Sequence, residues 1–144
     1  MIEIGKTNKL TIIRETPVGL HLADDDHNEV LLPGSLIDFD YKIGDRRDVF
    51  VYTDADGRAI ASPSKPYAEI GGFVYLRVTS TTEFGAFLDW GLEKDLFVPY
   101  NEQKVKMLED EFYVVHIYLD EKTNRLVASS RIDKFISNEN LSLE

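Results

Sequence analysis

The chain has 144 residues, no cysteine and a formal net charge of −10, and the absence of cysteine excludes a disulfide framework and a thiolate metal site. No segment approaches the about 20 apolar residues that span a bilayer, and residues 1–6 lack the apolar run of a signal peptide, so we expect a cytoplasmic protein with no membrane partner. The acidic charge argues against a nonspecific duplex-DNA binder, whose affinity comes from neutralising phosphates.

Short segments rich in β-branched and aromatic residues predict strands along the whole chain. In chain order they cover residues 10–14, 19–23, 29–32, 48–53 and 58–61, and then residues 74–78, 85–89, 95–98, 113–119 and 125–129. Residues 54–57 and 120–124 predict tight hairpin loops. Between the third and fourth strands of each set there is room for one helical turn, and residues 101–107 are the better candidate, with Asn101 as the cap.

The second set of strands nearly repeats the first at an offset of 66 residues. Residues 16–22 match residues 82–88, and residues 30–33 match residues 96–99, with glycine, proline and apolar positions in common. A repeat of this kind indicates two copies of one module. Five strands with a helical connection after the third are the OB-fold pattern, so we expect an all-β protein of two tandem five-stranded OB-fold barrels.

The repeat also predicts the domain boundaries. We expect one barrel over residues 1–63 and the other over residues 67–135, joined by a short linker that Pro63 and Pro66 stiffen. Residues 136–144 are polar and begin no third copy, which indicates a tail or the truncation point of a longer protein.

Alternation along the second strand of each copy predicts which side chains face outward. Ala86 and Leu88 match Leu20 and Leu22 of the first copy, and apolar residues at both places mark the barrel interior. Phe87 then faces outward. A bulge at Gly85 would bring Phe84 to the same face, and two exposed rings would form a platform on which nucleic-acid bases stack. The first copy has Val18 and His21 at these places, a weaker platform.

Residues 84–87 with Leu96-Phe97-Val98, and Asp120 with Arg125, resemble the signature of S1 RNA-binding domains. Residues 88–99 and 118–121 are more narrowly similar to the bacterial conserved virulence factor B family. The resemblance implies an RNA-binding regulator of gene expression with tandem S1 barrels followed by a winged-helix domain, of which this chain would be the first two barrels. In one departure from the family pattern, Val98 stands where S1 domains commonly place a third-strand histidine.

These observations define the expected nucleic-acid site. Its residues are Phe84, Phe87, Arg77, Tyr118, Asp120 and Arg125, with a weaker secondary site at His21, Tyr52 and Arg58. Phe84 and Phe87 would stack bases, while Arg77 and Arg125 would meet phosphates or base edges. These side chains also have a purely structural interpretation, which we call the structural alternative. In it the rings of Phe84 and Phe87 only cover the barrel mouth or pack on the partner barrel. Arg125 and Arg58 then only form exposed ion pairs with Asp120 and Asp54, respectively.

We expect no enzyme, catalytic residue, metal or cofactor, and no small-molecule substrate. The acidic run at residues 24–29 echoes a calcium loop but lacks its glycine at the sixth place and its glutamate at the twelfth. Two functions remain. One is binding of single-stranded RNA; the other is an acidic protein-interaction module without direct RNA binding, which docks on a basic partner or on missing C-terminal domains of its own chain.

Overall fold

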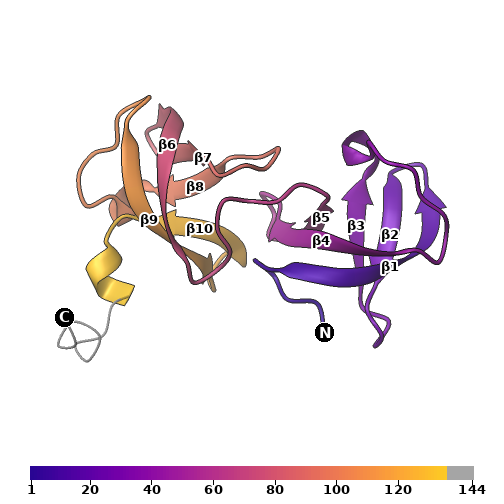
Figure 1. Ribbon diagram of the computed structural model, residues 1–144. Coiled ribbons are helices and arrows are strands. Elements are labelled where there is room, and N and C mark those ends of the chain that lie inside the picture. The colour runs from indigo at the N-terminus through magenta and orange to yellow at the C-terminus, as the bar shows by residue number, and fades with distance from the viewer. Residues whose placement is uncertain (136–144) are drawn as a thin grey trace.

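The computed structural model describes residues 1–135, which form two five-stranded β-units in succession along the chain (Figure 1). The first unit contains β1 (Thr7–Thr16), β2 (Gly19–Ala23), β3 (Glu29–Pro33), β4 (Arg46–Thr53) and β5 (Ala59–Ser62). The second contains β6 (Phe73–Thr82), β7 (Gly85–Asp89), β8 (Leu96–Pro99), β9 (Phe112–Asp120) and β10 (Arg125–Ser129). Three short 3₁₀ turns complete the fold: η1 (Gly34–Leu36), η2 (Tyr100–Glu102) and η3 (Ile132–Phe135). None of these helices has the length and hydropathy that crossing a membrane requires.

The two units have matching topologies. The first is a closed barrel in the order β1-β2-β3-β5-β4, and the second is a five-stranded sheet in the order β10-β9-β6-β7-β8. These orders confirm the predicted all-β fold with two OB-type barrels. The expected tail at residues 136–144 lies outside the described residues.

The cores follow the predicted alternation. Leu20 and Leu22 on β2, and Ala86 and Leu88 on β7, are all 0% exposed. Phe87 lies between two of these interior positions and is half-buried on the outer face of β7. The alternation of side chains along β7 therefore places this ring outside the barrel core, as predicted.

A helical turn follows β8 as expected, but it is shorter than residues 101–107 and begins one residue earlier. The turn η2 is only three residues long, and Pro99 rather than Asn101 precedes it without a side-chain cap. The side chain of Gln103 ends the turn, because its carbonyl oxygen accepts a hydrogen bond from the amide of Met107 at 2.9 Å. Met107 is 2% exposed, so its burial in the core fixes the loop in place of a helix.

The bulge predicted at Gly85 lies instead on β6. The β6–β7 register shifts between Val78 and Ser80, so Thr79 is the extra residue. Gly85 has a different role: a Cβ there would overlap the carbonyl oxygen of Val98 and would lie 2.7 Å from the ring of Phe97. Glycine is needed because the backbone of the neighbouring strand β8 comes too close to this position for a Cβ.

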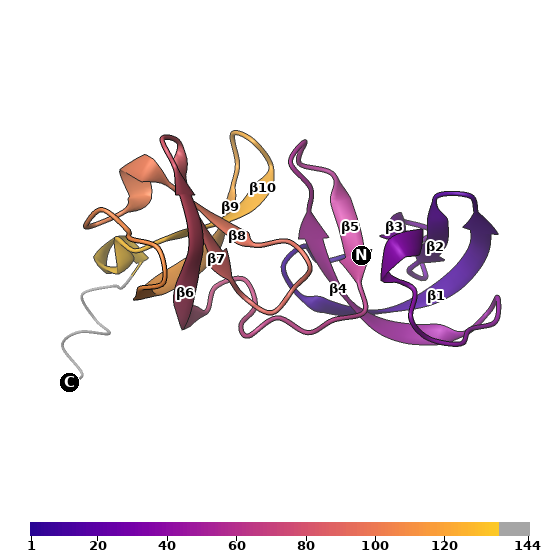
Figure 2. The same cartoon turned by 90° about the horizontal axis from the view of Figure 1, so that it is seen from above.

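The first barrel has an interior core of its own, and the core of the second barrel extends across the interface to two further residues of the first. In Figure 2 the β4–β5 hairpin of the first barrel lies next to the second barrel. Phe50 and Tyr52 point out of the first barrel from β4, yet they are only 1% and 4% exposed because they pack against the second barrel. The rings of Phe50 and Trp90 meet edge to face, with centroids 5.6 Å apart. Hydrogen bonds also cross the interface, among them the one from the amide of Ile70 to the carbonyl of Gly5 at 2.9 Å.

The hairpin that joins β4 to β5 packs against the hairpin that joins β9 to β10. Gly57 has φ +80°, and a Cβ at this position would lie 2.5 Å from the carbonyl oxygen of Thr123. The side-chain amide of Asn124 donates to the carbonyl of Gly57 at 3.0 Å. The amide of Leu126 donates to Thr53 Oγ1 at 2.8 Å. These contacts fix the first barrel's hairpin beside the start of β10.

Candidate nucleic-acid interface

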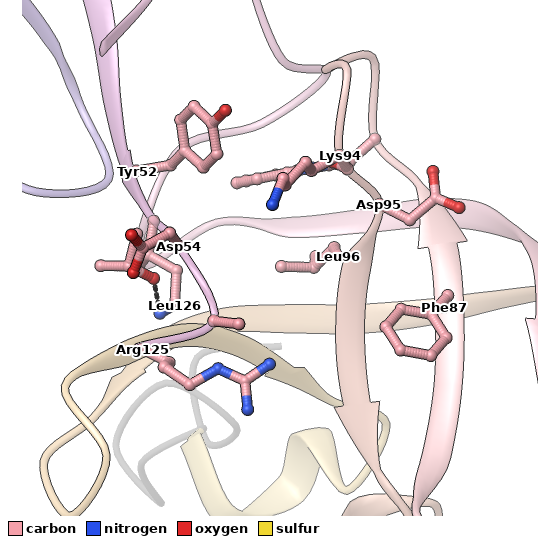
Figure 3. A pocket seen from close by; sticks show the side chains of 11 residues that line it. Tyr52, Asp54, Phe87, Lys94, Asp95, Leu96, Arg125 and Leu126 are labelled. Atoms are coloured by element: carbon pink, nitrogen blue, oxygen red, sulfur yellow. Dashed lines mark hydrogen bonds between the residues drawn. The ribbon is translucent and has the colours of Figure 1, made fainter. Parts of the chain in front are cut away.

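A cleft of about 300 Å³ opens where the two barrels meet, and we refer to it as the inter-barrel cleft (Figure 3). One wall is the end of β4 and its hairpin, at residues 52–55. The other wall comes from the second barrel, at Phe87, Trp90, residues 94–96 and residues 125–126. Figure 3 shows Tyr52 and Asp54 on one side and Phe87 and Asp95 on the other.

Two phenylalanine rings lie side by side on the outer face of the second barrel, and one of them, Phe87, lines the cleft. Phe87 on β7 is the direct cross-strand partner of Phe97 on β8, and their ring centroids are 5.2 Å apart. The guanidinium carbon of Arg125, from β10, lies 5.4 Å from the centroid of the Phe97 ring. An aromatic pair beside a cation offers a base a stacking surface and offers a phosphate a positive charge.

Phe97 was absent from the predicted site, although it is the neighbour of Val98 on β8. Val98 is 0% exposed and faces the barrel interior, so the outward residue of β8 is Phe97. Alternation of Leu96, Phe97 and Val98 is the sequence signal that identifies this ring. The third strand therefore contributes an aromatic side chain to the outer face.

Phe84 lies apart from the cleft, in the turn between β6 and β7. It is 73% exposed, and its amide donates to Thr82 Oγ1 at 3.1 Å. Its carbonyl oxygen accepts a hydrogen bond from the amide of Tyr100 at 2.9 Å. The ring that lies beside Phe87 is Phe97, as their centroid distance shows, rather than Phe84.

Arg77 and Tyr118 also lie outside the cleft. Arg77 on β6 pairs with Asp110 at 3.1 Å. The ring of Tyr118 on β9 packs against Phe135, with centroids 5.3 Å apart. Burial, together with nearby carboxylates, raises the pKa of Tyr118 to about 12, so its hydroxyl stays protonated at neutral pH.

Asp120 and Arg125 are cross-strand neighbours, but they form no ion pair within residues 1–135. The carboxylate of Asp120 accepts instead from Thr123 Oγ1 at 2.8 Å, inside the hairpin. The guanidinium of Arg125 turns to the ring of Phe97 and to the cleft. The ion pair of the structural alternative is therefore not formed by Arg125 among residues 1–135.

The first barrel differs at the same places. Arg58 pairs with Asp54 at 2.9 Å, the ion pair that the structural alternative expected. Burial by itself would raise the pKa of Asp54, but hydrogen bonds from Arg58 and from backbone amides outweigh it and lower the pKa. His21 is hydrogen-bonded to Thr16 Oγ1 at 2.9 Å. Of the secondary set only Tyr52 lines the cleft, and burial with nearby carboxylates raises its pKa to about 12.

The acidic run of the first barrel is arranged as a hairpin. The carboxylate of Asp24 accepts from the amide of Asn28 at 2.8 Å and pairs with the terminal ammonium of Met1 at 2.8 Å. Within the part of the chain that the structure describes, no group of three or more His, Asp or Glu side chains is placed to hold a metal ion.

Comparison with known proteins identifies the module. The family model described as S1 domain matches residues 4–63 and again residues 70–131. No curated protein sequence matches the chain.

Among solved structures, the chain is similar to a multidomain protein with nucleic acid binding domains from Streptococcus pneumoniae TIGR4, with a TM-score of 0.67 and 19% identity. That match covers 97% of this chain and 48% of the other, so this chain spans about half of the pneumococcal protein's length. A match to Drosophila Unr CSD456 covers 87% of this chain and 60% of that one at 17% identity. Its TM-score of 0.34 is too low to indicate a common fold. The tandem family matches and the two matching barrels lead to one conclusion: the chain belongs to the S1 domain family.

Proposed function

We propose that the chain binds single-stranded RNA, with bases stacked on Phe87 and Phe97 and phosphates met by Arg125. Membership in the S1 family supports a nucleic-acid-binding role, and S1 domains are binding modules rather than enzymes. The observation that carries the proposal is the ring pair at 5.2 Å beside a guanidinium that makes no ion pair within the described residues.

A single strand suits this surface better than a duplex does. Aromatic rings recognise unstacked bases, and each stacked base contributes about 1–3 kcal/mol whatever its sequence. With a net charge of −10 the chain cannot depend on many phosphate contacts, so stacking has to supply most of the affinity.

The resemblance to the conserved virulence factor B family, and the bacterial source of the structural neighbour, support the finer part of the proposal. The chain acts in the bacterial cytoplasm as the RNA-binding part of a regulator of gene expression.

Fluorescence anisotropy with labelled single-stranded RNA at low salt tests the proposal. Phe87→Ala together with Phe97→Ala should weaken binding by at least about fivefold, the loss of about 1 kcal/mol of stacking, and by up to about 150-fold. Phe112→Ala is a matched control, since Phe112 is 48% exposed on the outer face of the β6–β9 pair. Circular dichroism checks that each variant is folded. The absence of saturable binding by the unmodified chain would refute the proposal.

Arg125→Ala tests the electrostatic part. Removing one phosphate contact should lower the slope of log affinity against log salt by about 0.7 for a single strand. An unchanged slope would show that Arg125 meets no phosphate.

The alternative, a protein-interaction module, is favoured by a different surface. Four side chains on the outer face of β6 and β9 are exposed, namely Phe73 (45%), Tyr75 (65%), Phe112 (48%) and Val114 (44%). An exposed apolar patch of this kind is typical of a protein contact. If RNA binding is absent while Phe112→Ala and Tyr75→Ala weaken capture of a protein partner, this second function replaces the first.

A further inference from the structure

The inter-barrel cleft has a wall that a single S1 barrel would not have. Phe87, which lines the cleft, belongs to the second barrel, but residues 52–55 of the first barrel stand opposite. At about 300 Å³ the cleft is at the lower end of the range for small-ligand sites, a size that suits one nucleotide rather than a folded RNA element.

Two cations face this cleft without ion-pair partners among residues 1–135. They are Lys94, from the loop before β8, and Arg125, at the start of β10. Figure 3 shows the two side chains reaching toward the cleft from opposite ends. In a chain of net charge −10, two free cations at one cleft mark a local site for an anion.

The two carboxylates that line the cleft already have partners of their own. Asp54 is paired with Arg58 at 2.9 Å, and its Oδ1 accepts from the amides of Asp56 at 2.9 Å and Arg58 at 2.9 Å. Asp95 accepts a hydrogen bond from Thr79 Oγ1. Both carboxylates that line the cleft are thus already engaged, whereas Lys94 and Arg125 have no ion-pair partner among residues 1–135.

We propose that the inter-barrel cleft holds one nucleotide of the RNA strand, with its base against Phe87 and its phosphates contacted by Lys94 and Arg125. The first barrel then supplies a wall of the RNA site although it lacks an aromatic platform of its own. This inference rests on the proposed RNA binding and adds Lys94 and residues 52–55 to the site.

The wall is held in a fixed position by the interface. The hydrogen bond from the amide of Leu126 to Thr53 Oγ1, at 2.8 Å, ties the first barrel directly to the strand that carries Arg125. A cleft walled on both sides admits a single strand and excludes a duplex. The unequal copies therefore have different roles at one site: the second stacks the base, and the first limits the space around it.

Two variants of the full chain test the wall and the cation separately. Ala55 is exposed and lines the cleft, so Ala55→Trp fills it from the first barrel's side. The matched control is Ile43→Trp, which adds a similar ring at a first-barrel position that is 57% exposed and does not line the cleft. Lys94→Ala removes the new cation, and Lys42→Ala is its control, an exposed first-barrel lysine outside the cleft.

In anisotropy titrations with single-stranded RNA, Ala55→Trp should weaken binding at least about tenfold because a stacked base loses its place. Lys94→Ala should weaken binding about threefold or more and reduce the salt slope by about 0.7. Both controls should bind within about twofold of the unmodified chain. Thermal unfolding shows whether each variant is folded. If Ala55→Trp does not fold, Lys94→Ala still tests the proposal.

The outcomes separate the two proposals. If the Phe87 and Phe97 double variant loses binding while Ala55→Trp and Lys94→Ala bind like the unmodified chain, the RNA function stands and the inter-barrel nucleotide site is wrong. If the unmodified chain does not bind RNA, both proposals fail.

Discussion

Replacing Phe50 by alanine should separate the two barrels while leaving the fold of each barrel in place. Phe50 is 1% exposed, although it points out of the first barrel, because the second barrel covers it. Truncation of a buried phenylalanine costs about 3–5 kcal/mol, and the edge-to-face contact with Trp90 contributes about 0.5–1.5 kcal/mol of this loss. The free energy of unfolding should therefore fall by about 3 kcal/mol or more.

Urea unfolding, followed by the fluorescence of the single tryptophan and by circular dichroism, measures this loss. Because Trp90 lies in the core that extends across the interface, its fluorescence reports on the interface, while circular dichroism reports on the strands of both barrels. The unmodified chain should unfold in one transition with both probes, and Phe50→Ala should separate the two curves.

Phe112→Ala is again the matched control, because this ring is half-exposed and stacks on Tyr75, with centroids 5.2 Å apart. Its loss should be at most about 1.5 kcal/mol. If Phe50→Ala costs no more than Phe112→Ala, the core of the second barrel does not extend across the interface in solution, and the wall of the cleft loses its support.

Three further predictions follow from single contacts. Gly57→Ala should lower the free energy of unfolding, measured in urea titrations, by about 1–3 kcal/mol more than Gly44→Ala does. Both glycines have positive φ, but of the two only Gly57 lies against Thr123. Equal losses would contradict the contact between the hairpins. Burial of Glu102 opposes ionisation, but hydrogen bonds from Lys134 and Ser129 lower its pKa below 4.5. The stabilising contribution of the ionised carboxylate is therefore present above pH 4.5 and is lost as the pH falls through the folded-state pKa. The difference in free energy of unfolding between the unmodified chain and Glu102→Gln should therefore disappear in acid. A difference that persists in acid would contradict this reasoning. Burial lowers the pKa of His116, so its NMR titration should have a midpoint below 6.5.

The fold could be predicted because the same strand pattern occurs twice. The strands alternate, and Gly5 and Gly19 recur as Gly71 and Gly85, so the pattern of one copy supports that of the other. The turn at residues 101–107 could not be predicted in the same way. Its conformation depends on the burial of Met107 and on the side chain of Gln103, which are tertiary contacts.

The candidate site was only partly predictable. Alternation placed Phe87 outside the barrel, and the same reasoning identifies Phe97, the residue that was missed. No sequence pattern predicts that residues 52–55 form a wall of the cleft. Alternation predicts which face of a strand a side chain is on, but not which other part of the chain packs against that face. Tyr52 and Arg125 are brought to one cleft only by the packing of one barrel on the other.

The core that extends across the interface has a thermodynamic consequence for any ligand of the cleft. Domains joined only by a flexible linker have to be brought together when a ligand binds between them, and that ordering reduces the affinity. Here Phe50 and the hairpin at Gly57 already set the spacing before a ligand arrives. Binding then requires no closure step, so association should be a single-exponential process whose observed rate rises linearly with RNA concentration and shows no plateau.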